Sequence, residues 1–172
     1  MILATDVDYR EDLAVAAGVI FENWSSEKAF TTKTVNVTEF GDYVPGQFYK
    51  RELPCISALL EAIETPISCI VVDGFVTLGA DKRPGLGYHL WEKLEKKIPI
   101  IGVAKNSFQN TRSESEVFRG ISKNPLYVTA VGLDLSDAIN GIESMHGEHR
   151  LPTMLKLVDS VCRQRTPNLT AG

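Results

Sequence analysis

The sequence predicts an α/β protein in which an antiparallel meander of strands comes first and strands alternating with helices follow. Two observations support this fold class. The first 40 or so residues hold three strand-like segments with short connections, and parallel neighbours would need a crossover of about a dozen residues or more. After residue 49, helical periodicity alternates with short β-branched runs, which are typical of strands buried on both faces.

Each element is predicted from its periodicity. The expected elements, in chain order, are strands at 2–9, 13–21 and 30–40, a helix at 49–63, a strand at 67–72, a helix at 85–97, strands at 99–104 and 126–132, a short helix at 136–145 and a last helix that Pro152 opens. This order predicts an α/β, ribonuclease H-like mixed sheet, an antiparallel meander followed by parallel strands, with helices on both faces. Such a fold does not by itself define a function.

Length and composition predict one domain over residues 1–172, with a buried core and a polar tail at 166–172. The chain has 172 residues, of which 44% are hydrophobic and 23% charged. No apolar run reaches about 18 residues and Asp6 comes too early for a secretory signal peptide, so we expect a soluble, cytoplasmic protein without a membrane partner. A net charge of -4 excludes a generic polycation, so any nucleic acid must meet a local basic patch.

The cysteines predict neither a disulfide framework nor a zinc site. Cys55, Cys69 and Cys162 are odd in number, far apart and without a CxxC spacing. We therefore expect all three to pack in the core.

Three carboxylates lie at informative places in the predicted elements. Asp6 is in the first strand, Glu52 is at the start of the first helix, and Asp73 ends a buried strand. Open α/β sheets bind ligands at the carboxyl ends of their strands. A carboxylate there is costly unless a divalent cation or a helix N-terminus compensates its charge. Taken singly, each of the three is equally explained as a helix cap or a turn residue.

Four motifs follow one another along these segments. They are DVDY at 6–9, YVPGQFYKRELP at 43–54, VDG at 72–74 and IGVAK at 101–105. In this order they resemble the endonuclease V family. The resemblance implies a Mg²⁺-dependent endonuclease, with Mn²⁺ as a substitute, that recognises deaminated bases, inosine above all, in DNA or RNA and serves nucleic-acid repair.

The resemblance also implies catalytic roles for the matching residues. The matching positions are Asp6, Glu52 and Asp73 for the metal-binding carboxylates, and Lys105 for the catalytic lysine. His149, in the segment GEHR at 147–150, matches a histidine that the family brings near the metal, with His146 as the alternative. Hard carboxylate oxygens suit Mg²⁺, and they leave room for a phosphate and a water nucleophile.

The loop at 43–46 resembles the wedge with which the family enters a duplex and helps to hold the damaged base extruded. Its residues are Tyr43, Val44, Pro45 and Gly46. Seen alone, such a tetrapeptide is equally a simple turn. Arg51, beside Glu52, would bind a phosphate or pair with an acid.

The segment after Asp73 departs from the family pattern. Two histidines that the family carries there are replaced in residues 74–84. Asp81 would supply an oxygen ligand or none, and Lys82 and Arg83 would face solvent or phosphate. The run at 133–145 is also longer than in the family.

Two other functions fit parts of the sequence. A relative that binds nucleic acid without turnover fits the missing histidines and the acidic net charge, but a pure binder has no need to gather carboxylates where phosphates pass. Another ribonuclease H-like hydrolase acting on RNA fits the fold but not the wedge-like loop. The leading hypothesis is a metal-dependent endonuclease of the endonuclease V type.

Overall fold

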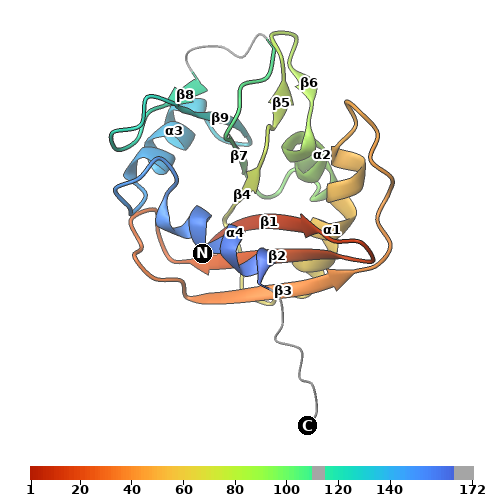
Figure 1. Ribbon diagram of the computed structural model, residues 1–172. Coiled ribbons are helices and arrows are strands. Elements are labelled where there is room, and N and C mark those ends of the chain that lie inside the picture. Colours follow the sequence, from red (N-terminus) through yellow and green to blue (C-terminus); the bar gives the residue numbers. More distant parts are fainter. Residues whose placement is uncertain (110–114, 165–172) are drawn as a thin grey trace.

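A seven-stranded mixed sheet forms the centre of the computed structural model, which describes residues 1–109 and 115–164 (Figure 1). The strand order across the sheet is β3-β2-β1-β4-β7-β9-β8. The strands of the sheet are β1 (Ile2–Tyr9), β2 (Ala14–Phe21), β3 (Thr31–Val37), β4 (Cys69–Asp73), β7 (Ile100–Ala104), β8 (Glu116–Val117) and β9 (Leu126–Val131). A hairpin lies outside the sheet and consists of β5 (Thr77–Leu78) and β6 (Arg83–Pro84).

Strand directions confirm the predicted meander and the first parallel strands. β1 pairs antiparallel with β2, and β2 with β3, whereas β4 is parallel to β1 and β7 is parallel to β4. The expectation that the sheet continues parallel is wrong at β9, which runs antiparallel to β7. The described part of the connection from β7 to β9 contains only the short strand β8 and no crossover helix, so the chain returns in the opposite direction.

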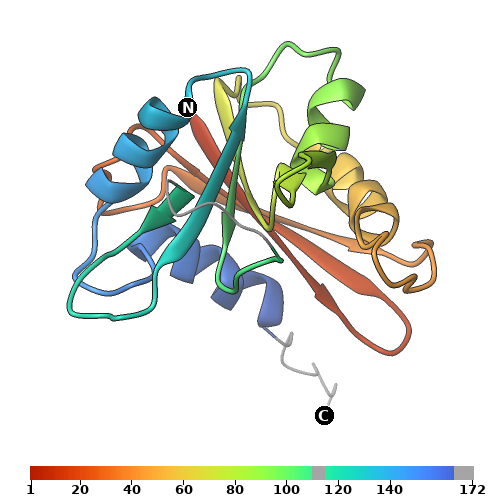
Figure 2. The same cartoon turned by 90° about the horizontal axis from the view of Figure 1, so that it is seen from above.

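Helices cover both faces of the sheet, as predicted. They are α1 (Tyr49–Glu61), α2 (Leu86–Lys93), α3 (Leu135–Ser144) and α4 (Thr153–Arg163). Figure 2 shows α1 and α2 on one side of the sheet and α3 and α4 on the other. Because side chains alternate along a strand, Leu3 and Ile70 pack beneath α1 and α2, while Ala4 and Val71 pack beneath α3 and α4.

Several element boundaries differ from those expected. The second helix ends at Lys93 rather than at residue 97, because Glu95 and Lys96 adopt positive φ angles of 56° and 61° that no α-helix contains. Strand β3 ends at Val37 rather than at residue 40. The hairpin strands and β8 were not expected, since two residues are too few to show a periodicity.

Burial agrees with the expected character of the chain. All three cysteines are free and buried, as predicted. Among the described residues, no helix is both long and apolar enough to cross a bilayer. The expected polar tail at 166–172 lies outside the described residues.

Candidate functional site

Strand register brings three of the expected site residues to one edge and one face of the sheet. The parallel pairing of β1 with β4 carries Asp6 to a position beside Asp73. Asp73 pairs with Val103 of β7, and Lys105 follows two residues later, so it points to the same face. These three side chains therefore meet at the carboxyl ends of β4 and β7, beside the middle of β1.

Glu52 reaches the same site from α1, which packs on the opposite face. It lies in the first turn of the helix, is only 4% exposed, and its Oε2 has no hydrogen-bond partner in the structure. Burial raises the pKa of Glu52 well above its usual value, and the charges of Asp73 and Asp6 raise it further. A buried carboxylate oxygen without a partner is expensive, and a bound cation is a usual remedy.

Electrostatic repulsion at the site is strong. Burial, and then the charge of Asp73, raises the pKa of Asp6 to about 7, although the Val7 N–H and Lys105 act in the opposite direction. Burial likewise raises the pKa of Asp73, and Lys105 lowers it. The protein's own positive charge therefore does not neutralise the carboxylates, and the all-oxygen donor set fits a hard divalent cation.

Helix α4 adds two side chains that the sequence reasoning missed. Among the described residues, one group of three potential metal ligands lies within 4.8 Å of one another, and it consists of Asp6, Asp159 and Cys162. Glu52 and Asp73 do not form so tight a triad with Asp6. A helical signal existed, because Asp159 lies four residues after Leu155 and three before Cys162, on the apolar stripe of the last helix.

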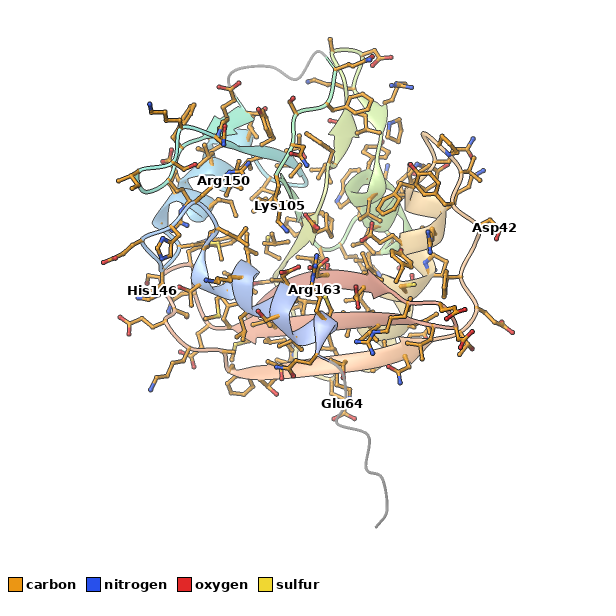
Figure 3. All side chains as sticks on the ribbon, in the orientation of Figure 1. Asp42, Glu64, Lys105, His146, Arg150 and Arg163 are labelled. Atoms are coloured by element: carbon orange, nitrogen blue, oxygen red, sulfur yellow. The ribbon has the colours of Figure 1, made fainter. Side chains whose placement is uncertain are left out.

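The site is a shallow depression next to basic side chains. Its lining includes Asp6, Asp73 and Lys105 together with Leu151 and Leu155. Figure 3 labels Lys105 at the end of β7 and Arg163 on α4. The Nε of Arg163 donates to Oδ1 of Asp159 at 2.9 Å. Phosphate groups would thus meet positive charge beside the carboxylates.

The loop at 43–46 is an exposed turn. The Gln47 amide donates to the Val44 carbonyl at 3.0 Å, and Gly46 has φ +77°, which with Pro45 gives a type II turn. Tyr43 is 60% exposed and meets Phe48 edge-on, with ring centroids 6.1 Å apart. This aromatic tip lies just before α1, which carries Glu52 in its first turn.

Arg51 stacks on aromatic rings instead of pairing with an acid. Its guanidinium lies 4.0 Å from the ring centroid of Tyr9 and 5.3 Å from that of Phe40. Its Nε has no hydrogen-bond partner, and within the described residues it forms no ion pair. The expected pairing of Arg51 with an acid is therefore absent among the described residues, and phosphate binding remains as its expected role.

Two arginines hold the segment that carries His149. Arg119 donates to four backbone carbonyls, those of Met145, Gly147, His149 and Arg150. Arg150 in turn donates to the carbonyls of Lys105 and Pro125. The segment is therefore hydrogen-bonded to the residue that follows β7, Lys105.

The two candidate histidines differ in their surroundings. His149 is exposed, and no side-chain hydrogen bond caps α4 at Pro152. Nδ1 of His146 lies 2.9 Å from Oγ1 of Thr153, and its Nε2 lies 3.9 Å from Glu27. Figure 3 labels His146 to the left of α4, away from Lys105.

The chain that leaves Asp73 crosses directly over β7. A Cβ at Gly102 would lie 2.5 Å from the Gly74 carbonyl oxygen and 2.8 Å from the Val76 nitrogen, so only glycine admits this approach. Further on, Asp81 is exposed and its Oδ2 lies 3.5 Å from Nε of Arg83. A cavity of about 320 Å³ beside this segment is lined by none of the expected carboxylates.

A ribonuclease H-like sheet with carboxylates at its strand ends defines a class of nucleases, and comparisons identify the family within it. Residues 1–122 match the family model described as Endonuclease V. An endonuclease V of Streptomyces coelicolor is 30% identical over 185 residues, which cover 94% of this chain and 77% of the relative. The chain belongs to the endonuclease V family.

Solved structures agree with this assignment. The crystal structure of endonuclease V from Streptomyces avermitilis has a TM-score of 0.73 and 26% identity, and covers 94% of this chain and 79% of its own. That of Ciona intestinalis endonuclease V, in complex with DNA containing an inosine, has a TM-score of 0.76 and 19% identity, with 94% and 83% covered. These neighbours confirm the ribonuclease H-like fold.

Proposed function

We propose that this chain is a Mg²⁺-dependent endonuclease that cleaves a phosphodiester bond near a deaminated base, inosine above all, in DNA or RNA. The observation that carries the proposal is the buried, unpartnered oxygen of Glu52, a carboxyl whose pKa the charges of Asp73 and Asp6 raise. Such an arrangement is costly for a binding protein and useful for a metal enzyme. We further propose a role in nucleic-acid repair, carried out in the cytoplasm.

Asp6, Glu52 and Asp73 would hold the cation, and Asp159 adds a fourth carboxylate from α4. A bound Mg²⁺ supplies a sharpened water nucleophile and stabilises charge on the phosphate. Lys105 places a positive charge that already acts on Asp6 and Asp73, and it would stabilise the negative charge that builds on the phosphate. His149 would orient or deprotonate the attacking water.

Substrate recognition is assigned to the exposed loop. Extruding a base costs a few kcal/mol, least for a mispaired base, and the protein must replace the lost stacking. Tyr43 and Pro45, held at the tip by the turn from Val44 to Gly46, are exposed and suited to this role. The Ciona intestinalis neighbour, whose fold this chain shares, was crystallised with DNA that contains an inosine. Arg51 would support the loop and contact phosphate.

The decisive experiment compares strands with and without the lesion. Labelled DNA and RNA, each with one inosine or with a matched guanosine, are incubated with the protein and Mg²⁺, Mn²⁺ or chelator. We expect cleavage of inosine strands only with metal, and none by Asp73→Ala. Lesion-specific binding without cleavage would favour a catalytically impaired relative, and equal cleavage of RNA with or without inosine would favour another ribonuclease H-like hydrolase.

A further inference from the structure

A thiol lies directly beside the carboxylates. The Sγ of Cys162 and carboxylate oxygens of Asp6 and Asp159 all lie within 4.8 Å of one another. Cys162 is 1% exposed, and its thiol also lies 3.2 Å from the Asp159 carbonyl. The three side chains come from β1 and from one face of α4, two elements that pack together along the sheet.

A second observation points to a cation in this region. Glu52, which is 4% exposed, has a carboxylate oxygen without any hydrogen-bond partner, and the charges of Asp73 and Asp6 raise its pKa beyond the effect of burial. Asp6 is therefore shared by two groups of potential ligands, the carboxylates with Glu52 and Asp73 on the one side, and the pair of Asp159 and Cys162 on the other. Asp6 could be a ligand of a cation in either group, but it could not complete the coordination of two cations at the same time.

The two ligand groups differ in their chemistry, because only one of them contains a sulfur atom. Mg²⁺ is hard and takes oxygen ligands, so Cys162 contributes nothing to it. Tetrahedral Zn²⁺ accepts thiolate at about 2.3 Å and carboxylate oxygen at about 2.0–2.2 Å, so its sulfur and oxygen ligand atoms are about 3.6 Å apart. The triad at 4.8 Å needs only small side-chain adjustments to close on such an ion.

Burial and the carboxylates of Asp6 and Asp159 raise the pKa of the Cys162 thiol, so a cation must displace its proton, but the neighbouring arginines leave the ligand atoms accessible. Arg163 donates to Oδ1 of Asp159, which leaves Oδ2 for a cation, and the side chain of Asp159 is 27% exposed and gives access from solvent. Arg10 donates to the Cys162 carbonyl, so it does not block the sulfur. On binding, the Cys162 thiol loses its proton to solvent and its sulfur becomes a thiolate ligand of the cation, with no change of oxidation state.

We propose that Asp6, Asp159 and Cys162 form a site for a thiophilic divalent cation, Zn²⁺ or a cation like it, and that its occupancy competes with Mg²⁺ for Asp6. The site would make the protein sensitive to zinc. The competition rests on the proposed Mg²⁺-dependent function, whereas the binding itself does not.

Cobalt spectroscopy tests the binding without any nuclease assay. Co²⁺ alone is titrated into the protein, and the thiolate-to-cobalt charge-transfer absorption is recorded for the wild type, Cys162→Ser and Cys69→Ser. Cys69 is the matched control, because it is buried and free but belongs to no ligand group among the described residues. We expect the band in the wild type and in Cys69→Ser, its loss in Cys162→Ser, and its displacement by Zn²⁺.

Two further measurements keep the proposal open to refutation. Asp159→Asn, which retains the thiol, should weaken Co²⁺ binding at least about tenfold; this variant decides the matter if Cys162→Ser does not fold. Zn²⁺ should inhibit Mg²⁺-dependent cleavage at lower concentration in the wild type than in Cys162→Ser. A wild type without the band, or a band that persists in Cys162→Ser, overturns the site, whereas a band without any cleavage overturns only the proposed function.

Discussion

At the scale of single residues, the buried carboxyl groups of Glu52 and Asp6 lower the stability of the metal-free fold. They are 4% and 8% exposed, and burial raises the pKa of both carboxyls. Without a cation, each must keep an unfavourable charge or take up a proton. Sites of this kind trade stability for function.

Replacing Glu52 with glutamine should therefore stabilise the metal-free protein. The amide has the same shape without the charge, and we expect a gain of about 1 kcal/mol at pH 8 in chelator, or roughly 2–4 °C in the melting temperature. Thermal unfolding measures this gain. The same variant should lose both Mg²⁺-dependent cleavage and the stabilisation that Mg²⁺ gives the wild type, and a lower melting temperature in chelator would contradict the role of its charge.

The variant His149→Ala tests the resemblance to the family in the C-terminal part of the chain. We expect His149→Ala to lower turnover about 10²-fold with less effect on substrate binding, as for the loss of one water-orienting group. Single-turnover cleavage of an inosine strand measures the effect, and His146→Ala is the matched control, since His146 contacts Thr153 and Glu27. Full turnover in His149→Ala, with loss in His146→Ala, would exchange their roles.

At the scale of elements, two segments without regular structure position the site. The aromatic loop before α1 is held by a turn and by ring contacts from Phe48 to Tyr9. The segment before α4 is held by Arg119 through four carbonyls and by Arg150 through two more. Buried carbonyls that lose such donors become costly, so these arginines fix the shape of the segment.

Tyr43→Ala tests the loop. If the ring stacks in the gap that an extruded base leaves, discrimination between inosine and guanosine strands should fall by roughly 1–3 kcal/mol, the worth of one aromatic stacking contact. Ratios of kcat/KM for the two strands measure it. Metal-induced stabilisation should be unchanged, and an equal loss on both strands would instead assign Tyr43 to phosphate positioning or to structure.

Arg150→Ala tests the positioning of Lys105. Because Arg150 donates to the Lys105 carbonyl, its loss should shift the lysine and lower kcat by roughly ten- to a hundredfold with little change in KM. Arg83→Ala, which removes an exposed arginine that pairs with exposed Asp81 and lies over the Phe108 ring, is the control and should keep its activity. A change in KM alone would show that Arg150 acts on substrate binding.

At the scale of the whole molecule, the sheet brings together carboxylates from the helices on both of its faces. α1 supplies Glu52 from one side, α4 supplies Asp159 from the other, and strands β1 and β4 supply Asp6 and Asp73. Folding therefore brings together carboxylates that repel one another. Stability without metal should consequently depend on pH.

The sign of this dependence follows from Asp6. Its pKa is raised from 3.8 to about 7, so the folded state binds the proton more tightly than the unfolded state does. Its stabilising contribution is complete below the unfolded pKa and is lost as the pH rises toward 7. In chelator, the melting temperature of the wild type should fall relative to that of Asp6→Asn between pH 4 and pH 7, on the order of 5 °C. Parallel curves for the two proteins would contradict this assignment.

Local sequence patterns determined much of this protein. β-branched runs and helical periodicity located most of the strands and helices, and a carboxylate at the end of a buried strand made Asp73 a candidate site residue. Matching motifs added Asp6, Glu52 and Lys105. These features can be read within about a dozen neighbouring residues, because they depend on the chain's own period and not on its partners.

Only the tertiary structure decided the rest. The direction of β9, the approach of Asp159 and Cys162 to Asp6, and the hold of Arg150 on Lys105 join segments far apart in the chain. Each depends on the pairing of the strands and on which face of α4 packs against the sheet. Both are set when the two faces of the sheet are buried together. A stretch of sequence carries its own periodicity, but it does not contain the distance to a residue about 150 positions away.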